Sequence, residues 1–262
     1  IREARSFLTF TRADQYPFID GSASVSRERP SKILYPGSDT SNNYALSADL
    51  SFEVDLWGKL RRATEAAQSD LLATEAAYRN VTISLVANVA SAYFLLRDLD
   101  GRLQISRDTV KSRTESLKII QARFDKGTVP ELDVNQAEIE LAIAEAAVSA
   151  FERQTVQAEN ALQFLLGRNP GPIQRGLPLE QQVMPSDIPV GLPSELLQRR
   201  PDLVEAEERL ISETALIGVA EALRYPSIGL TGSLGLLSDD FSDLTDSDAK
   251  TWNIAGGLFA PI

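Results

Sequence analysis

The sequence predicts a mainly helical protein that also carries β-strands of membrane-spanning length. Two long stretches have apolar and small residues at alternating steps of four and three, the spacing of a heptad helix seam. Four other stretches of about ten residues alternate apolar and polar side chains, the spacing of a strand with one wet face. An internal repeat, in which residues 16–24 correspond to residues 225–233, places one strand pair before the long helices and one after them.

Composition excludes several classes of protein. The 262 residues are 43% hydrophobic, which is enough to bury a sizeable core and argues against disorder. The chain has no Cys and no His, so it lacks disulfides, thiolate nucleophiles, the commonest general base and the commonest metal ligand. We expect no metal site and no cofactor. The formal net charge of −11 argues against nucleic acid as a partner.

The first elements are a helical end and a β-hairpin. Residues 1–15 are expected to end a helix, and residues 16–57 to form the first hairpin. Apolar and polar residues alternate from Tyr44 to Val54 and again around Ile19. Aromatic residues mark strand ends, as in the interfacial girdles of membrane barrels: Tyr16, Tyr44, Trp57, Tyr225 and Trp252.

Residues 58–166 are predicted to form a hairpin of two long helices. The heptad pattern of the first helix extends from Lys59 to about Asp125 without a proline, and a helix of that span is on the order of 100 Å long. The second helix has the same rhythm and an additional apolar stripe. Two stripes predict neighbours on two sides, as in a closed ring of helices.

The segment between these helices carries clear signals for the end of one helix and the start of the next. Gly127 supplies a helix stop. Thr128 and Glu131 have the spacing of a capping box, and Pro130 is expected in the first turn of the second helix. The sequence therefore predicts a tight antiparallel turn near residues 124–133.

The remaining chain contains a linker, a helix and a second hairpin. Residues 167–193 hold six prolines and four glycines, which predicts an extended segment lying against another element, or a linker. Residues 194–224 are expected to form a helix that is disturbed at Pro201. Residues 225–262 repeat the alternation of the first hairpin and are predicted to form a second, truncated one.

No helix is expected to span a membrane. The longest uncharged run, Asn80–Leu96, is shorter than the roughly 20 residues that a spanning helix needs, and it contains several polar residues. Any membrane role must therefore come from the strands. The alternative for the strands is an ordinary soluble sheet with one face in water.

Five segments follow one another in an order that is specific to one family. They are SFEVDLWGKLRRATEAAQ, ARFDKGTVPELDVNQAE, ALQFLLGRNPG, GLPSELLQRRPDLVEAEERL and YPSIGLTGSLG. These segments resemble the outer-membrane factor family of TolC-like outer-membrane efflux proteins, and most closely the lipoprotein branch that works with resistance-nodulation-division pumps. The lipid-bearing Cys of that branch and a last helical hairpin are not among these residues, so we expect the chain to be a fragment.

The resemblance implies a homotrimer in the lipid of the bacterial outer membrane. Long antiparallel heptad helices would form an α-barrel tunnel in the periplasm, and each protomer would give four strands to a shared 12-strand β-barrel. Residues 167–193 would belong to the belt around the tunnel. Four membrane strands cannot close on themselves and would leave unpaired edges in lipid, so closure by oligomerisation is also expected on physical grounds.

The implied function is that of a passive exit duct in a tripartite efflux system associated with multidrug resistance. An inner-membrane pump, linked through a periplasmic adaptor protein, would supply the energy, because the chain has no phosphate-binding Gly-Lys loop. We expect no enzymatic activity. The alternatives are a structural or secreted coiled-coil protein with a small terminal sheet and, least supported, an enzyme that uses carboxylates.

By the same resemblance, the turn between the long helices is the periplasmic tip. Asp133 is the gate candidate, because it matches an acidic position that the family uses in polar links that close the tip. The alternative is a well-capped turn whose charges are solvated. The residues expected to dock the adaptor are Arg123, Lys126, Gly127, Thr128, Val129, Pro130 and Glu131.

Polar strand residues are the second group of candidates. In a membrane barrel they would face a water-filled lumen, and in a soluble sheet they would face solvent. The acidic loop from Ser238 to Asp248 lacks the central Gly and terminal Glu of an EF-hand, so we expect a solvated exterior loop. The lumen-facing candidates are Asp20, Asp49, Ser51, Glu53, Thr231 and Ser233.

Overall fold

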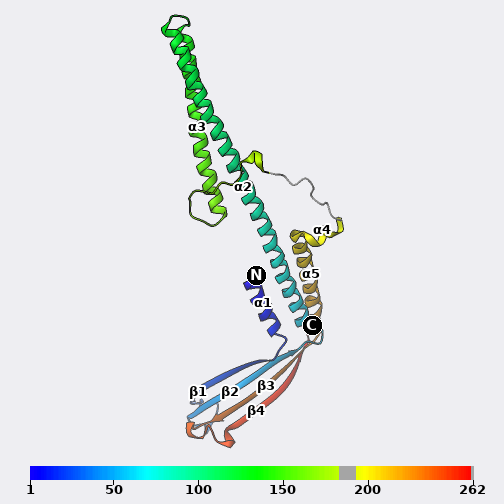
Figure 1. The fold of residues 1–262 in the computed structure, drawn as a ribbon. Coiled ribbons are helices and arrows are strands. Elements are labelled where there is room, and N and C mark those ends of the chain that lie inside the picture. The colour runs from blue at the N-terminus through cyan, green and yellow to red at the C-terminus, as the bar shows by residue number, and fades with distance from the viewer. Residues whose placement is uncertain (183–192, 261–262) are drawn as a thin grey trace. The chain divides into compact units, whose positions relative to one another are not determined.

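The computed structural model describes residues 1–182 and 193–260 (Figure 1). It consists of two units, residues 1–79 with 193–262 and residues 80–192. The helices are α1 (Arg2–Ala13), α2 (Lys59–Asp125), α3 (Glu131–Leu165), α4 (Pro193–Arg199) and α5 (Pro201–Ala222). The strands are β1 (Phe18–Glu28), β2 (Ser41–Val54), β3 (Ser227–Ser238) and β4 (Lys250–Phe259). The predicted fold class, mainly helical with four strands, is confirmed.

The strands form one antiparallel sheet in the order β1-β2-β3-β4 (Figure 1). Residues opposite each other in the ladder share a face, so the register sorts the side chains into two faces. The apolar face is continuous across all four strands. It carries Ile19, Ala23 and Val25 of β1, Leu46, Leu50, Phe52 and Val54 of β2, Ile228, Leu230, Leu234 and Leu236 of β3, and Trp252, Ile254 and Leu258 of β4.

The apolar face and both edges of the sheet are open within the described part of the chain. Every residue of β1 and of β4 is exposed to solvent, and the side chains of Trp252 and Ile254 are 75% and 79% exposed. The outer edges of β1 and β4 have no pairing strand among the described residues. A sheet in water would have to cover such a face, because buried apolar area is the main source of its stability.

The passage from β2 into α2 depends on Asp55. Its carboxylate oxygens accept hydrogen bonds from the backbone N–H groups of Leu60 and Arg61, at 3.2 and 3.0 Å. These groups would otherwise lack partners at the start of a helix. Gly58 takes a φ of 81°, a left-handed conformation that suits glycine and completes the change of direction.

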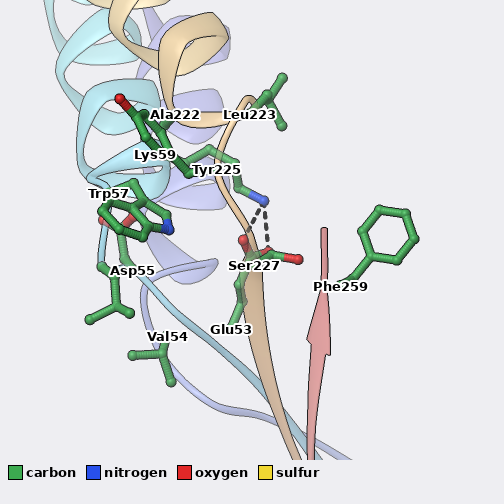
Figure 2. A pocket seen from close by; sticks show the side chains of 11 residues that line it. Glu53, Val54, Asp55, Trp57, Lys59, Ala222, Leu223, Tyr225, Ser227 and Phe259 are labelled. Atoms are coloured by element: carbon green, nitrogen blue, oxygen red, sulfur yellow. Dashed lines mark hydrogen bonds and ion pairs between the residues drawn. The ribbon is translucent and has the colours of Figure 1, made fainter. Parts of the chain in front are cut away.

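Aromatic residues join this passage to the start of β3 (Figure 2). The rings of Trp57 and Tyr225 stack with centroids 4.7 Å apart, and the indole N–H of Trp57 donates to the carbonyl of Pro226 at 2.7 Å. The ammonium of Lys59 pairs with the carboxylate of Glu53, with a 2.7 Å contact to Oε2 (Figure 2). The two repeats of the sequence therefore meet at one junction beside the sheet.

Small side chains line the helices of this unit. Ala66, Ala67, Ala73 and Ala76 of α2 are buried, as are Ser212, Ala215 and Ala222 of α5. The helices approach closely at Gly218, where an added Cβ would lie 3.2 Å from Cγ of Arg62. Gln15, just after α1, reaches α2 by donating from Nε2 to Oγ1 of Thr64 at 2.5 Å.

In residues 80–192, α2 and α3 run as an antiparallel pair joined by a short turn (Figure 1). Leu96 and Leu99 of α2 and Val134, Ala144 and Leu162 of α3 are buried. Two ion pairs link the helices along their length, Arg107 with Glu152 at 2.8 Å and Arg113 with Glu140 at 2.7 Å.

One window of α2 has the composition of a membrane span, contrary to the expectation that no helix would qualify. Its mean hydropathy is 1.2 over 18 residues, and 6% of it is buried. The window belongs to a helix of 67 residues. A single helix that passes on length and composition alone is weak evidence for a span.

Candidate functional site

The polar face of the sheet brings all six residues predicted to line a lumen onto one surface. The register sets Asp20 of β1 opposite Asp49 of β2, and Asp49 opposite Ser233 of β3. It likewise sets Ser51 opposite Thr231. The full set is Asp20, Asp49, Ser51, Glu53, Thr231 and Ser233, because Glu53 follows Ser51 at the two-residue period of a strand.

Two carboxylates face each other at the centre of this surface. Like charges opposite each other destabilise an antiparallel pair, so Asp20 and Asp49 require a well-hydrated setting. The hydroxyl of Ser47 donates to Oδ2 of Asp49 at 2.7 Å, and the hydroxyls of Ser22 and Ser47 are 2.8 Å apart. Neither serine is among the residues predicted to line a lumen, although both share the same alternation.

The charges on this face differ in how they are balanced. Glu53 pairs with Lys59 at the helix end of the sheet, so its negative charge is compensated. The carboxylate of Asp20 has no ion-pair or hydrogen-bond partner among the residues that the structure describes. The middle of the polar face is therefore more negative than its helix end.

The second candidate site is the turn between α2 and α3. Gly127 has a φ of 71° and donates its N–H to the carbonyl of Phe124 at 2.8 Å. Thr128 binds the carbonyl of Arg123 twice, through its backbone N–H at 3.0 Å and its hydroxyl at 2.8 Å. These bonds satisfy carbonyl groups that would be left open at the end of α2.

The predicted capping box is wrong. The residue before α3 is Pro130, in an extended conformation and without a side-chain cap, and the hydroxyl of Thr128 serves α2 instead. A box starting at Thr128 would require Val129 to be helical. The residue before a proline is sterically driven away from the helical region, so α3 begins only at Glu131.

The charged residues of the turn project into solvent. Arg123, Lys126, Glu131 and Asp133 are exposed. None of them has a side-chain ion pair in the part of the chain that the structure describes. With Asp125, which is also exposed and accepts a hydrogen bond from Gln121, the turn presents two cations and three carboxylates on a hydrogen-bonded backbone.

A third cluster, centred on Arg175, has no counterpart in the sequence analysis. Its guanidinium donates to both carboxylate oxygens of Asp100 on α2, at 2.9 and 3.1 Å, and to Glu159 on α3 at 2.5 Å. These bonds, first those to Asp100 and then that to Glu159, raise the pKa of Arg175 above its usual value against the opposing effect of burial. Arg175 stays charged at every accessible pH.

The same cluster fixes the segment after α3. The backbone N–H of Gly176 donates to the hydroxyl of Tyr93 at 2.9 Å, and a guanidinium N–H of Arg97 donates to the carbonyl of Leu177 at 3.2 Å. The described part of residues 167–193 therefore lies against the helices. Residues 183–192 of that predicted segment lie outside the described residues.

Comparison with known proteins identifies the family. The outer membrane efflux protein family matches residues 1–168 and 192–262, which is most of the chain. The chain belongs to the outer membrane efflux protein family. It is 36% identical over 265 residues to the solvent efflux pump outer membrane protein SrpC of Pseudomonas putida, and 33% identical over 263 residues to the cation efflux system protein CusC of Escherichia coli K12.

Solved structures of similar proteins have the same fold. The chain matches a membrane protein from Pseudomonas aeruginosa with a TM-score of 0.91 at 35% identity, covering 100% of this chain and 62% of that one. It matches CusC with a TM-score of 0.89 at 32% identity, covering 100% of this chain and 60% of that one. All of this chain aligns with SrpC and with CusC, but it spans only 56% and 57% of their lengths.

Proposed function

We propose that this chain is part of a passive exit duct in the bacterial outer membrane, with its helices in the periplasm. The observation that carries the proposal is the two-faced sheet with open edges. Its strands have 10 to 14 residues, enough to cross the hydrocarbon of a bilayer when tilted. An uncovered apolar face beside a hydrated acidic face fits lipid on one side and a water-filled lumen on the other.

The open edges support a homotrimer. Unpaired N–H and C=O groups are too costly in lipid, so the edges of β1 and β4 must be paired there. Neighbouring strands are antiparallel throughout, and with an even number of strands β4 of one copy can pair antiparallel with β1 of the next. Three copies of four strands would close a 12-strand barrel.

The energy for export must come from partners. Members of this family are channels rather than enzymes, and the polar groups of the sheet and the turn are spread along surfaces instead of converging on a reacting atom. We propose that an inner-membrane pump drives transport through a periplasmic adaptor, which docks at the turn. Relatives are named for solvent and for cation efflux, and a wall of Ser, Thr, Asp and Glu suits the wetted passage of small solutes.

The first test is conduction by the intact protein in planar bilayers. We expect discrete channels that prefer cations, because Asp20 and Asp49 place negative charge on the lumen wall. The Asp20→Asn/Asp49→Asn double variant should lower the cation-to-anion permeability ratio by about twofold, since the field in the lumen weakens. Ser22→Ala, which changes the same face without changing charge, should leave the ratio unaltered. An intact protein that conducts no ions would overturn the duct.

The second test concerns the gate. Asp133 is exposed at the first turn of α3 and its carboxylate has no partner within the described residues, so it is free to link to another helix of a closed tip. We expect Asp133→Ala to raise the resting conductance by about threefold, because one charge-assisted link is worth roughly 1 kcal/mol or more. Glu138→Ala removes another exposed carboxylate of α3 and is the matched control. Equal conductance of the two variants would remove Asp133 from the gate.

A further inference from the structure

The end of the sheet away from the helices has its own distribution of charge. All three helix connections, from α1 to β1, from β2 to α2 and from α5 to β3, lie at the opposite end. The far end is formed by the loops of residues 29–40 and 239–249 (Figure 1). If the helices lie in the periplasm, these loops face the exterior, so the inference made here rests on the proposed function.

Positively charged residues lie where the apolar face reaches this far end of the sheet. Arg27 of β1 and Lys250 of β4 occupy the same alternating positions as Val25 and Trp252, so both belong to the face proposed to meet lipid. Arg29 follows directly after β1 and is exposed. None of these three cations has an ion pair in the described ranges 1–182 and 193–260.

Carboxylates gather on the other side of the same end. Polar-face residues Ser26 and Ser41 line a hollow of about 650 Å³ at this end of the sheet. The carboxylates that share this hollow are those of Glu28, Asp239, Asp243, Asp246 and Asp248. Charge is therefore sorted by face, with carboxylates above the lumen side and free cations on the lipid side.

Apolar and aromatic side chains accompany the cations. Trp252 lies two residues beyond Lys250 on the apolar face. In the loop after β1, Ile33 is 91% exposed, and Leu34 and Tyr35 are also exposed. Aromatic rings favour the boundary between lipid chains and headgroups, and the long stems of Arg and Lys allow their charges to reach that boundary from a lipid-facing position.

We propose that Arg27, Arg29 and Lys250 form a docking rim for phosphate-bearing lipid headgroups of the outer leaflet. Arg binds phosphate through two parallel N–H···O bonds and Lys adds a point charge. Each cation near an anionic membrane surface strengthens binding, so three cations together favour a phosphorylated headgroup. The carboxylates on the lumen side keep the same anionic headgroups away from the mouth. The rim thus fixes the depth of the barrel and keeps lipid out of its opening.

The test measures lipid binding to the intact protein in detergent by native mass spectrometry. The probes are lipid A with both phosphates and the same lipid A after enzymatic removal of its phosphates. We expect the phosphorylated form to bind at least about tenfold more tightly, and the Arg27→Gln/Arg29→Gln/Lys250→Gln variant to lose that difference. The control variant Lys111→Gln/Lys118→Gln/Arg153→Gln removes three exposed, unpaired cations of α2 and α3 and should retain it.

Conductance of the same samples separates this proposal from the duct itself. The rim variant should still form channels, because its substitutions leave strand pairing and the lumen wall unchanged. Equal affinity for the two lipids, or an equal loss in both triple variants, overturns the rim even when conduction is normal. A wild-type protein that conducts no ions would instead overturn the proposal that the chain is part of a duct.

Discussion

Replacing Gly235 with alanine is expected to destabilise the four-stranded sheet by about 1–3 kcal/mol, the cost of overpacking a tight site. A Cβ at Gly235 would lie 2.7 Å from the carbonyl oxygen of Leu46 and 3.3 Å from Cβ of Ser47, both on β2. Backbone cannot yield as a flexible side chain can, so β2 and β3 would have to separate. Because β2 and β3 come from different repeats, the substitution weakens the pairing that joins the two hairpins.

The measurement is the temperature at which the intact protein, in detergent, loses the compact electrophoretic mobility of its folded form. Gly229→Ala is the matched control, because Gly229 lies on the same strand and face and a Cβ there would meet nothing within 4 Å. We expect the control to unfold at the wild-type temperature or slightly above it, since alanine restricts the unfolded chain. Similar melting of the two variants would contradict the close approach at Gly235.

Replacing Arg175 with leucine is expected to cost about 2 kcal/mol of the stability of residues 80–182. This value lies between the small contribution of an exposed ion pair and the larger loss on breaking a buried one. The side chains of Arg175, Asp100 and Glu159 are 27%, 24% and 18% exposed. Removing the guanidinium leaves the partly buried carboxylate of Glu159 without its counter-charge and leaves Asp100 paired only with Arg97. It also removes the side chain that holds the segment beside Gly176 against both helices.

Hydrogen exchange of the intact protein should report this loss as faster exchange at the backbone amides of positions 175 and 176 and along the adjoining turns of α2 and α3. Arg107→Leu is the control. It removes another ion pair between α2 and α3, at 2.8 Å, but its side chains are 53% and 51% exposed, so we expect little change. Equal effects of the two substitutions would show that the Arg175 cluster is an ordinary surface pair.

Local periodicity explains why the fold class could be predicted. Heptad spacing from Lys59 onward and alternation from Tyr44 to Val54 each depend on residues close in the chain, and both reappear as α2 and β2. The same alternation sorted Asp20, Asp49 and Ser233 onto the polar side. That Asp20 lies directly opposite Asp49, and Asp49 opposite Ser233, could not be predicted. These positions depend on the register between the strands, which is set by a long loop in one case and by distant segments of the chain in the other.

Other features depend on contacts or conflicts that no spacing encodes. Arg175 binds Asp100 although the two residues are 75 positions apart in the chain. Nothing in the Pro- and Gly-rich composition around Arg175 predicts that it links two helices. At the turn, two local rules competed. The spacing of Thr128 and Glu131 favoured a capping box, but the steric effect of Pro130 on Val129 prevailed and moved the start of α3.

The pairing of β2 with β3 also sets the order in which the chain assembles. Trp57 and Pro226 are in contact although they are 169 residues apart in the chain, whereas α2 and α3 are neighbours through a short turn. Contacts between near residues form quickly, and those that close long loops form slowly. The helical hairpin and the two local strand pairs, β1 with β2 and β3 with β4, therefore form before β2 pairs with β3. If the chain is part of an outer-membrane duct, it can cross the periplasm with its two hairpins separate and complete its sheet only on reaching the membrane.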